Sequence, residues 1–507
     1  MSQRSLPDKY YGENGIHRVP LWRLAGFALN NTATNTYMFL FQYIAYYMQG
    51  FIGVATVTAS SIAMFMRIWD GVTDPLIGAV LDKTNGRFGK NRPFMVIGQL
   101  ILLVMSYLMF HITPMIPENF RFVAFLVMEA IYYIGYTFQC VVTKSAQTCM
   151  TNDPKQRPLF SVFDAIFNTI LFALMPLFVT DIAMKNGGFF AQETWNSMWL
   201  LVAGMSMTFT IIAVISIAPK DRMEFYGTGK PVKVGFKDYW DTIKNNRAIQ
   251  MLIVSASTDK LAASMRTSTM LIIIFALIVG DYAIYGKITS LTAIPGTILS
   301  TILISTLATR LGQRKAMLFG SWGGIFCNIC FILLFLFGDP TTMSNGGGNV
   351  NFGFFTIAYI VLMILMSGFQ GVSGNIVIPM TADCADYEVY RTGKYVPGLM
   401  GTLFSLVDKL ISSFAPMLTG LALAAVGFVT KMPDATTPAS IMQTGMYEGQ
   451  VINTGAILPI TLALVYGTVI IGLICNIVAL KFYPLTKEFM AEIEDKIAKI
   501  KAGTISE

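Results

Sequence analysis

Residues 67–94 read RIWDGVTDPLIGAVLDKTNGRFGKNRPF, and this stretch decides the fold. Its first half is an apolar run that carries two aspartates, Asp70 and Asp74, four residues apart. Its second half is a short turn rich in glycine, lysine and arginine, after which another apolar run begins at Pro93. Two long apolar segments joined by a basic turn predict a pair of membrane-spanning helices whose connection faces the cytoplasm.

The composition of the whole chain favours a membrane protein. Of its 507 residues, 54% are hydrophobic and only 13% are charged, whereas ordinary soluble domains have about 25% charged residues. This argues against a soluble enzyme, a disordered chain and a nucleic-acid-binding protein, so no nucleic acid is expected as a partner. Six cysteines are too few for a disulfide scaffold, and two histidines leave little room for a histidine metal site. The net charge of +7 is therefore first a topology signal.

Apolar runs of about 20 residues or more recur along the chain, and each is long enough to cross a bilayer as a helix. The runs are continuous rather than alternating, which argues against a β-barrel. Residues 1–20 lack the apolar core of a signal peptide, so no cleaved signal peptide is predicted. The sequence thus predicts an all-α membrane protein with twelve transmembrane helices, at residues 21–50, 55–81, 93–113, 121–149, 159–181, 196–218, 248–279, 283–309, 315–338, 352–380, 398–427 and 456–482.

Lysine and arginine gather in alternate connections between these helices, which predicts a multi-pass protein of the cell membrane with both termini in the cytoplasm. The longest internal linker, 219–247, holds seven basic residues and separates six helices from six helices. The predicted parts are a cytoplasmic N-terminal segment, a first bundle, the linker, a second bundle and a cytoplasmic tail, at 1–20, 21–218, 219–247, 248–482 and 483–507. The tail mixes Glu and Lys at helical spacing, as expected for an amphipathic helix at the membrane surface.

The turn after the second helix has a weaker echo at the matching place in the second half of the chain. The first turn carries Gly78, Asp82, Gly86 and Arg87, and the second reads RLGQRK at 310–315. This repeated turn resembles that of the major facilitator superfamily. The resemblance implies two six-helix bundles around a site near the middle of the bilayer.

The few charges inside the predicted spans need a physical reason, because a charged side chain at the bilayer centre costs roughly 2.5–3.5 kcal/mol on insertion scales. Asp70 and Asp74 lie on one helix face, and two carboxylates that close together favour a cation between them. Oxygen ligands alone suit a hard monovalent cation, and Thr73 adds another oxygen. The alternative is that each aspartate pairs with Arg67 or another basic residue.

The first predicted helix is unusually polar over residues 30–36, where Asn31, Thr34 and Asn35 are candidates to contact a substrate. Such side chains facing lipid would have no partner. They therefore line an aqueous cavity or form hydrogen bonds between helices, and both explanations stay open at this point.

Four more spans carry charges whose roles the sequence leaves open. Lys144 either pairs with Asp164 or faces a cavity and meets an anionic group of the substrate. Asp259 and Arg266 lie about two turns apart, so either one of them reaches the cavity or each pairs locally. Lys409, in SLVDKLISSF, could complement the two aspartates from the other half of the chain.

Four stretches spread along nearly the whole chain resemble the glycoside–pentoside–hexuronide:cation symporters, the family that includes the melibiose permease. The first and most specific is residues 67–94, and the others are TNDPKQRPLF at 151–160, ADCADYEVYRTGKYVPGLMGTLFSLVDK at 382–409 and KFYPLT at 481–486.

The resemblance implies specific roles for several residues. Asp70, Thr73, Asp74 and Thr137 correspond to the coupling-cation site, and Lys409 corresponds to a lysine of the family's eleventh helix. Where the permease binds galactosides with acids and a tryptophan, this chain aligns Thr34, Cys140 and Lys144. The loss of acids and the gain of a lysine favour an acidic sugar such as a hexuronide.

The sequence therefore predicts a sugar or glycoside symporter that is driven by Na⁺, Li⁺ or H⁺, works by alternating access and has no further cofactor. Asp70 and Asp74 would hold only a monovalent cation, and Asp164 and Asp259 would join Lys409 in a charge network. A uniporter or an exchanger on the same fold is the alternative. An integral membrane enzyme is disfavoured, because no nucleophile–base set or metal cluster is recognisable.

Overall fold

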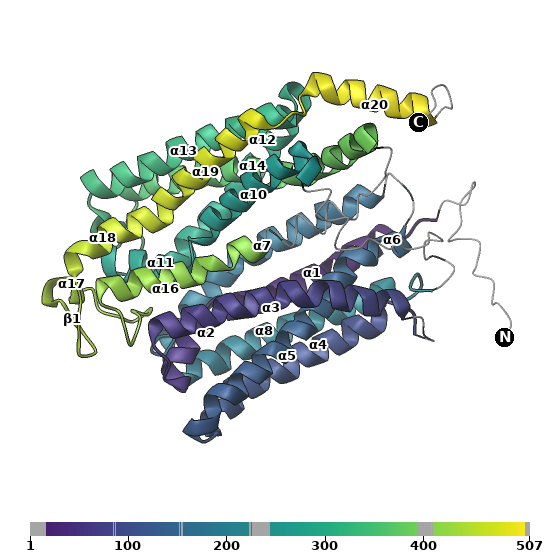
Figure 1. Ribbon diagram of the computed structural model, residues 1–507. Coiled ribbons are helices and arrows are strands. Elements are labelled where there is room, and N and C mark those ends of the chain that lie inside the picture. Colours follow the sequence, from purple (N-terminus) through teal and green to yellow (C-terminus); the bar gives the residue numbers. More distant parts are fainter. Residues whose placement is uncertain are drawn as a thin grey trace. The chain divides into compact units, whose positions relative to one another are not determined.

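The computed structural model describes residues 17–84, 86, 88–151, 153, 156–222, 225, 244–392, 407 and 409–501 (Figure 1). The chain divides into two compact units: residues 1–54 and 65–230 form unit 1, and residues 55–64 and 231–507 form unit 2. Each unit is built from long helices, as the apolar runs predict. Most of the predicted linker and the start of the predicted span 398–427 lie outside the described residues.

Unit 1 contains helices that pack pairwise along their length, with α1 against α7 and α8, and α4 against α5 and α8. Its elements are α1 (Leu21–Phe41), α2 (Ile44–Tyr47), the π-helix η3 (Met48–Ile52), α3 (Thr56–Lys83, in unit 1 from Phe65 onward), α4 (Arg92–Tyr107), the π-helix η4 (Leu108–Ile112), the 3₁₀ turn η5 (Thr113–Met115), α5 (Glu118–Ser145), α6 (Gln147–Met150), α7 (Arg157–Lys185) and α8 (Gln192–Ile217).

Unit 2 is also built mainly from helices, with α14 packed against α12 and α13 and with α10 packed against α19. Its elements are α10 (Arg247–Ser264), α11 (Ser268–Ile272), the π-helix η7 (Ile273–Ile278), α12 (Ala283–Leu311), α13 (Gln313–Phe337), the 3₁₀ turn η8 (Pro340–Met343), α14 (Phe354–Thr392), α16 (Phe414–Val426), α17 (Ile441–Thr444), the strands β1 (Met446–Tyr447) and β2 (Gln450–Val451), α18 (Thr454–Leu462), the π-helix η9 (Ala463–Gly467), α19 (Thr468–Phe482) and α20 (Lys487–Lys501).

Within the described ranges, nine helices are long and apolar enough to cross a membrane, and α10 with the segment after it makes a tenth span that is bent by 43°. Helices α1 and α3 are also long, with 21 and 28 residues, but their polar and charged residues keep them outside this set. The all-helical membrane fold is therefore confirmed, and the count of twelve spans stays a prediction.

The two basic turns join helices through different polar contacts. In unit 1 the carboxylate of Asp221, which follows α8 and is fully buried, accepts hydrogen bonds from the backbone N–H groups of Lys90, Asn91 and Arg92 at 2.8–3.2 Å. It also lies 3.4 Å from the Arg92 Nε. These bonds satisfy the orphan N–H groups at the start of α4.

Gly89 makes this close approach possible. Its φ is +89°, and a Cβ atom at this position would lie 2.2–2.5 Å from atoms of Asp221. In unit 2, by contrast, Arg314 donates to the backbone oxygens of Leu480 and Lys481 at the end of α19, at 3.0 and 3.3 Å. The first turn therefore depends on a carboxylate at a helix start, and the second on a guanidinium at a helix end.

The C-terminal helix α20 uses its apolar face for packing on unit 2. Met490 and Ile493 belong to a buried cluster with residues of α10, α13, α14 and α19. The ring of Phe489 contacts those of Tyr387 and Tyr390 on α14, with centroids 6.1 and 5.8 Å apart. The predicted amphipathic tail thus forms a helix whose apolar side is anchored on the protein.

Substitution Asp221→Ala will destabilise the protein strongly, because it leaves the buried amides at the start of α4 and the Arg92 guanidinium without their acceptor. Breaking a buried pair from one side costs about 3–5 kcal/mol. Thermal unfolding of the detergent-solubilised protein should show this loss. The control is Asp181→Ala, which removes an exposed ion pair with Lys185 and should cost no more than about 1 kcal/mol. Equal effects of the two substitutions would contradict this role of Asp221.

Candidate cation and sugar site

Three oxygen-bearing side chains meet between α3 and α5, as predicted for the cation site. The Thr137 hydroxyl donates to Asp70 Oδ1 at 3.1 Å and lies 3.0 Å from the Thr73 hydroxyl. The Thr73 hydroxyl also donates to the backbone oxygen of Asp70 at 2.9 Å. All three side chains are buried, with at most 8% of their surface exposed. We call these three residues the carboxylate–hydroxyl cluster.

Asp74 lies one helical turn beyond Asp70 on α3 and is half-buried. The alternative explanation from the sequence is that each aspartate pairs with Arg67 or another basic residue. The Arg67 side chain is exposed, and in the described structure it makes no ion pair with either aspartate. Pairing with Arg67 therefore does not explain why two aspartates lie on one face of this helix. The cluster offers oxygen atoms only, which are the ligands that a hard cation prefers.

The polar run of α1 forms hydrogen bonds to α7. The Asn31 amide donates to Asp164 Oδ1 at 2.8 Å, and the Asn35 amide donates to Asn168 Oδ1 at the same distance. Asn168 in turn donates to Asp164 Oδ1 at 2.9 Å. Thr34 is buried and donates to the backbone oxygen of Asn30 within its own helix. The interhelical explanation thus accounts for Asn31 and Asn35, and their predicted contact with substrate stays a prediction.

Lys144 and Asp164 do not form the ion pair that was one of the two predicted alternatives. Asp164 accepts hydrogen bonds from two amides instead. Lys144 lies in the last turn of α5, and its side chain is exposed. Cys140, one turn earlier, is half-buried. Contact of Lys144 with an anionic group of the substrate stays a prediction, and an exposed lysine in a last helical turn also fits a side chain that reaches toward the cytoplasm.

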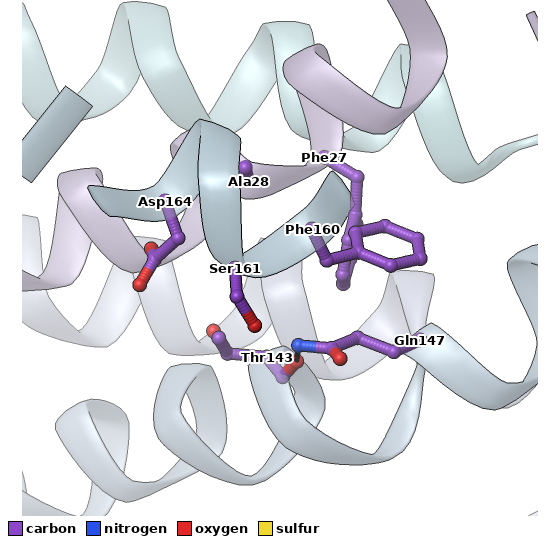
Figure 2. Close-up of a pocket in the computed structure, with 7 residues that line it drawn as sticks. All are labelled: Phe27, Ala28, Thr143, Gln147, Phe160, Ser161 and Asp164. Atoms are coloured by element: carbon purple, nitrogen blue, oxygen red, sulfur yellow. Dashed lines mark hydrogen bonds between the residues drawn. The ribbon is translucent and has the colours of Figure 1, made fainter. Parts of the chain in front are cut away.

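A small cavity lies beside these residues in unit 1 (Figure 2). Asp164 and Ser161 project toward it from α7, and Thr143 lies opposite on α5. Its volume is about 60 Å³, which is room for one or two water molecules, whereas a pocket for a small organic ligand needs about 300 Å³ or more. This cavity is therefore too small to hold a sugar ring in the state described.

Arg266 lies where a span of unit 2 is broken. It falls between α10 and α11, next to Thr267, whose side chain caps α11 by accepting from the Met270 N–H. The guanidinium contacts the thioether sulfurs of Met363 and Met366, both at 3.3 Å. Its carbon also lies 6.0 Å from the centre of the Tyr466 ring in η9.

Asp259 and Arg266 do not pair with each other. Asp259 is half-buried, and in the described structure no ion pair joins it to Arg266, so both predicted alternatives for the two residues stay open. Thioether sulfur is a weak hydrogen-bond acceptor, and the five N–H donors of a guanidinium keep most of their capacity here. Arg266 is thus able to donate hydrogen bonds to a further ligand.

The remaining predicted charge, Lys409, is half-buried and belongs to unit 2. Its complementation of Asp70 and Asp74 stays a prediction. Asp408, its neighbour, lies outside the described residues.

Sequence reasoning missed one buried acid in unit 1. Glu129 lies in α5 with none of its surface exposed, and both of its carboxylate oxygens lack a hydrogen-bond partner. The signal was present, because a carboxylate in the middle of an apolar run should always be questioned. It was overlooked because Glu129 has no charged neighbour in the sequence and belongs to none of the four matching stretches.

Long apolar helices with buried polar clusters inside them define a multi-span membrane transporter. Residues 26–486 match the family described as MFS/sugar transport protein, so the chain belongs to this family. This confirms the predicted resemblance, the fold class, and the prediction of a transporter rather than an enzyme.

Known proteins resemble the chain over nearly its full length. The "Glucuronide carrier protein homolog" of Escherichia coli is 23% identical, with 96% of this chain and 98% of the relative covered. The "Isoprimeverose transporter" of Lactiplantibacillus pentosus is also 23% identical, with 96% and 94% covered. The crystal structure of a bacterial homologue of the lysosomal transporter Spinster superposes with a TM-score of 0.59 at 12% identity, covering 94% of this chain and 98% of that one, and shows the fold alone.

Substitution Thr137→Val removes the hydroxyl that donates to Asp70 while keeping the shape of the side chain. We expect the affinity for the coupling cation to fall about fivefold, the equivalent of one hydrogen bond of about 1 kcal/mol. Titration of the purified protein with NaCl, followed by thermal shift, measures this change. Thr143→Val on the same helix is the control and should leave the cation affinity unchanged. An unaltered affinity in Thr137→Val would remove Thr137 from the site.

Proposed function

We propose that this chain is a secondary active transporter that couples the inward movement of Na⁺, Li⁺ or H⁺ to the uptake of a sugar or glycoside by alternating access. The observation that supports this most is the carboxylate–hydroxyl cluster, in which Asp70, Thr73 and Thr137 lie within hydrogen-bond distance of one another. Asp74 completes the proposed cation site from the next turn of α3. The protein would act in the cell membrane with both termini in the cytoplasm.

Coupling requires that the cation favour the state that binds sugar, and this coupling free energy is reciprocal. One monovalent cation that enters with a neutral sugar gains about 2.3 kcal/mol per 100 mV of membrane potential. This gain supports an accumulation of nearly fiftyfold, since each 1.4 kcal/mol is a factor of ten. An anionic sugar would cancel the electrical gain unless a second cation travelled with it.

We further propose that the substrate is an acidic sugar such as a hexuronide, with Arg266 as the residue that binds its carboxylate. Met363, which contacts Arg266, follows the start of α14 by nine residues, or about 14 Å along the helix axis. With the start of α14 at the edge of a hydrocarbon core about 30 Å thick, Arg266 would lie near mid-depth. Transporter substrate sites commonly lie there, beside broken helices. The glucuronide carrier homologue supports an acidic substrate, and the isoprimeverose transporter supports a neutral one.

Substitutions Asp70→Asn and Asp74→Asn test the cation site. Each keeps the size of the side chain and removes the charge that the cation requires, so we expect concentrative uptake to be lost. Proteoliposomes with an imposed Na⁺ or H⁺ gradient and radiolabelled methyl glucuronide or isoprimeverose provide the measurement.

Counterflow in the same vesicles separates the proposal from its alternative. A symporter variant with a damaged cation site can still exchange sugar for sugar, whereas a uniporter would show no cation dependence even in the wild type. If both variants still concentrate sugar as the wild type does, the cation-site assignment is wrong.

Substitution Arg266→Gln tests the acidic substrate. Loss of charge-assisted hydrogen bonds worth about 1.5–3 kcal/mol should reduce methyl glucuronide uptake by about 10- to 150-fold. Isoprimeverose uptake should change little in the same variant.

Lys144→Ala is the matched comparison, because Lys144 is the other basic candidate. A selective loss of glucuronide uptake in Lys144→Ala, with Arg266→Gln unaffected, would move the anion site to Lys144. Loss of both substrates alike in Arg266→Gln would contradict a role in recognising charge.

A further inference from the structure

Glu129 differs from the other buried or paired acids that the structure describes in unit 1. Asp221 is bonded by Asn91 and Arg92, and Asp164 accepts from Asn31 and Asn168. Asp153 and Asp181 form ion pairs with Arg18 and Lys185, and Asp70 accepts from Thr137. Glu129 has no exposed surface, no ion pair, and no hydrogen bond to either carboxylate oxygen.

A carboxylate in these surroundings cannot remain ionised at reasonable cost. An isolated charge in a low-dielectric interior is far less stable than in water, and the group takes up a proton instead of staying charged. Glu129 is therefore held as a neutral carboxylic acid in the state described. The proton is the ligand that satisfies this site, since nothing else in the described structure neutralises it.

The position of Glu129 links it to the proposed cation site. It precedes Thr137 by eight residues on α5, which is about 12 Å along the helix axis. The next residue, Ala130, accepts a hydrogen bond from the Trp69 indole N–H at 3.1 Å. Trp69 directly precedes Asp70 on α3. Glu129 thus lies on the same helix as Thr137 of the carboxylate–hydroxyl cluster, next to a residue whose backbone is bonded by α3.

The titratable groups near Glu129 come from three helices. Tyr132 and Tyr133 share α5 with it and interact with it electrostatically. Helix α1 contributes Tyr37, whose ring centre is 6.1 Å from that of Tyr132, and Arg67 and Asp70 of α3 lie near Tyr133. Helix α4 carries no charged residue after its first, Arg92. The hydroxyl group of Tyr132 is buried and, like Glu129, has no hydrogen-bond partner in the described structure.

We propose that Glu129 is a proton-binding site of the transport cycle, separate from the cation site at Asp70 and Asp74. The acid keeps its proton while its side chain is buried, as here. When a movement of the helices exposes Glu129 to water, the O–H bond breaks, the proton passes to water and the carboxylate forms. The proposal rests on the proposed function, because it assigns this step to the same transport cycle.

Infrared difference spectroscopy of the full-length protein in lipid tests the site without any sugar or sodium. A protonated carboxyl group has its own C=O stretching band, which shifts in D₂O. Between about pH 6 and pH 10, above the range in which ordinary carboxyl groups titrate, we expect the wild type to lose such a band. The band should be absent from Glu129→Gln. It should persist in Glu118→Gln, the same substitution at an exposed position on α5.

A second variant distinguishes the loss of the acid from a folding defect. Glu129→Asp keeps a titratable acid, so its band should move rather than vanish. A wild type without a titrating band, or a Glu129→Gln variant that retains the wild-type band, would overturn the proposal.

A transport readout then separates this proposal from the proposed function. Exchange of methyl glucuronide or isoprimeverose in proteoliposomes should vary with pH in the wild type and lose that variation in Glu129→Gln. An unchanged pH profile in Glu129→Gln would show that the proton stays bound throughout the cycle, against the proposal. If Asp70→Asn keeps the infrared band but also keeps cation-coupled uptake, the cation site fails while the proton site stands.

Discussion

A polar group in the hydrocarbon of a bilayer has no water to bind, so the protein itself must satisfy it. Much of unit 1 follows from this constraint. The amides of α1 would be costly against lipid, and they bond instead to Asp164 and Asn168 on α7. This bonding fixes the rotation of α1 against α7. The carboxylate–hydroxyl cluster between α3 and α5 obeys the same rule, with the hydroxyl of Thr137 satisfying Asp70.

The same constraint explains why the few charged residues inside the predicted spans indicate function. Asp70 and Glu129 lie inside α3 and α5, and Arg266 lies at the break between α10 and α11; each of these predicted spans would cross the membrane more easily without its charge. Asp70 is supported by hydroxyl oxygens and Arg266 by two thioethers and an aromatic ring, whereas Glu129 has no hydrogen-bond partner in the described structure. These surroundings support the proposals of a monovalent cation at Asp70, an anionic group at Arg266 and a proton at Glu129. A cation-coupled carrier uses ligands of these kinds.

Much of the fold and part of the candidate cation site could be predicted from the sequence. The positions of the spans, and the residues that share a helix face, depend on local spacing along the chain. The four-residue spacing placed Asp70 and Asp74 on one face, and the resemblance added Thr137 from a distant helix. The partners of Asp164 and the isolation of Glu129 could not be predicted, since they depend on how each helix is rotated against its neighbours. The break at Arg266 was also hidden, because the stretch SMRTS contains neither proline nor glycine.

The central claim is that a cation bound near Asp70 and Asp74 changes the affinity for sugar. Isothermal titration of the purified wild-type protein tests it most directly, with methyl glucuronide and isoprimeverose titrated with and without NaCl or LiCl and at several pH values. The account predicts that one cation raises the affinity for one sugar, and that this sugar raises the affinity for the cation by the same factor. Sugar binding that does not change with any of the three cations would contradict it.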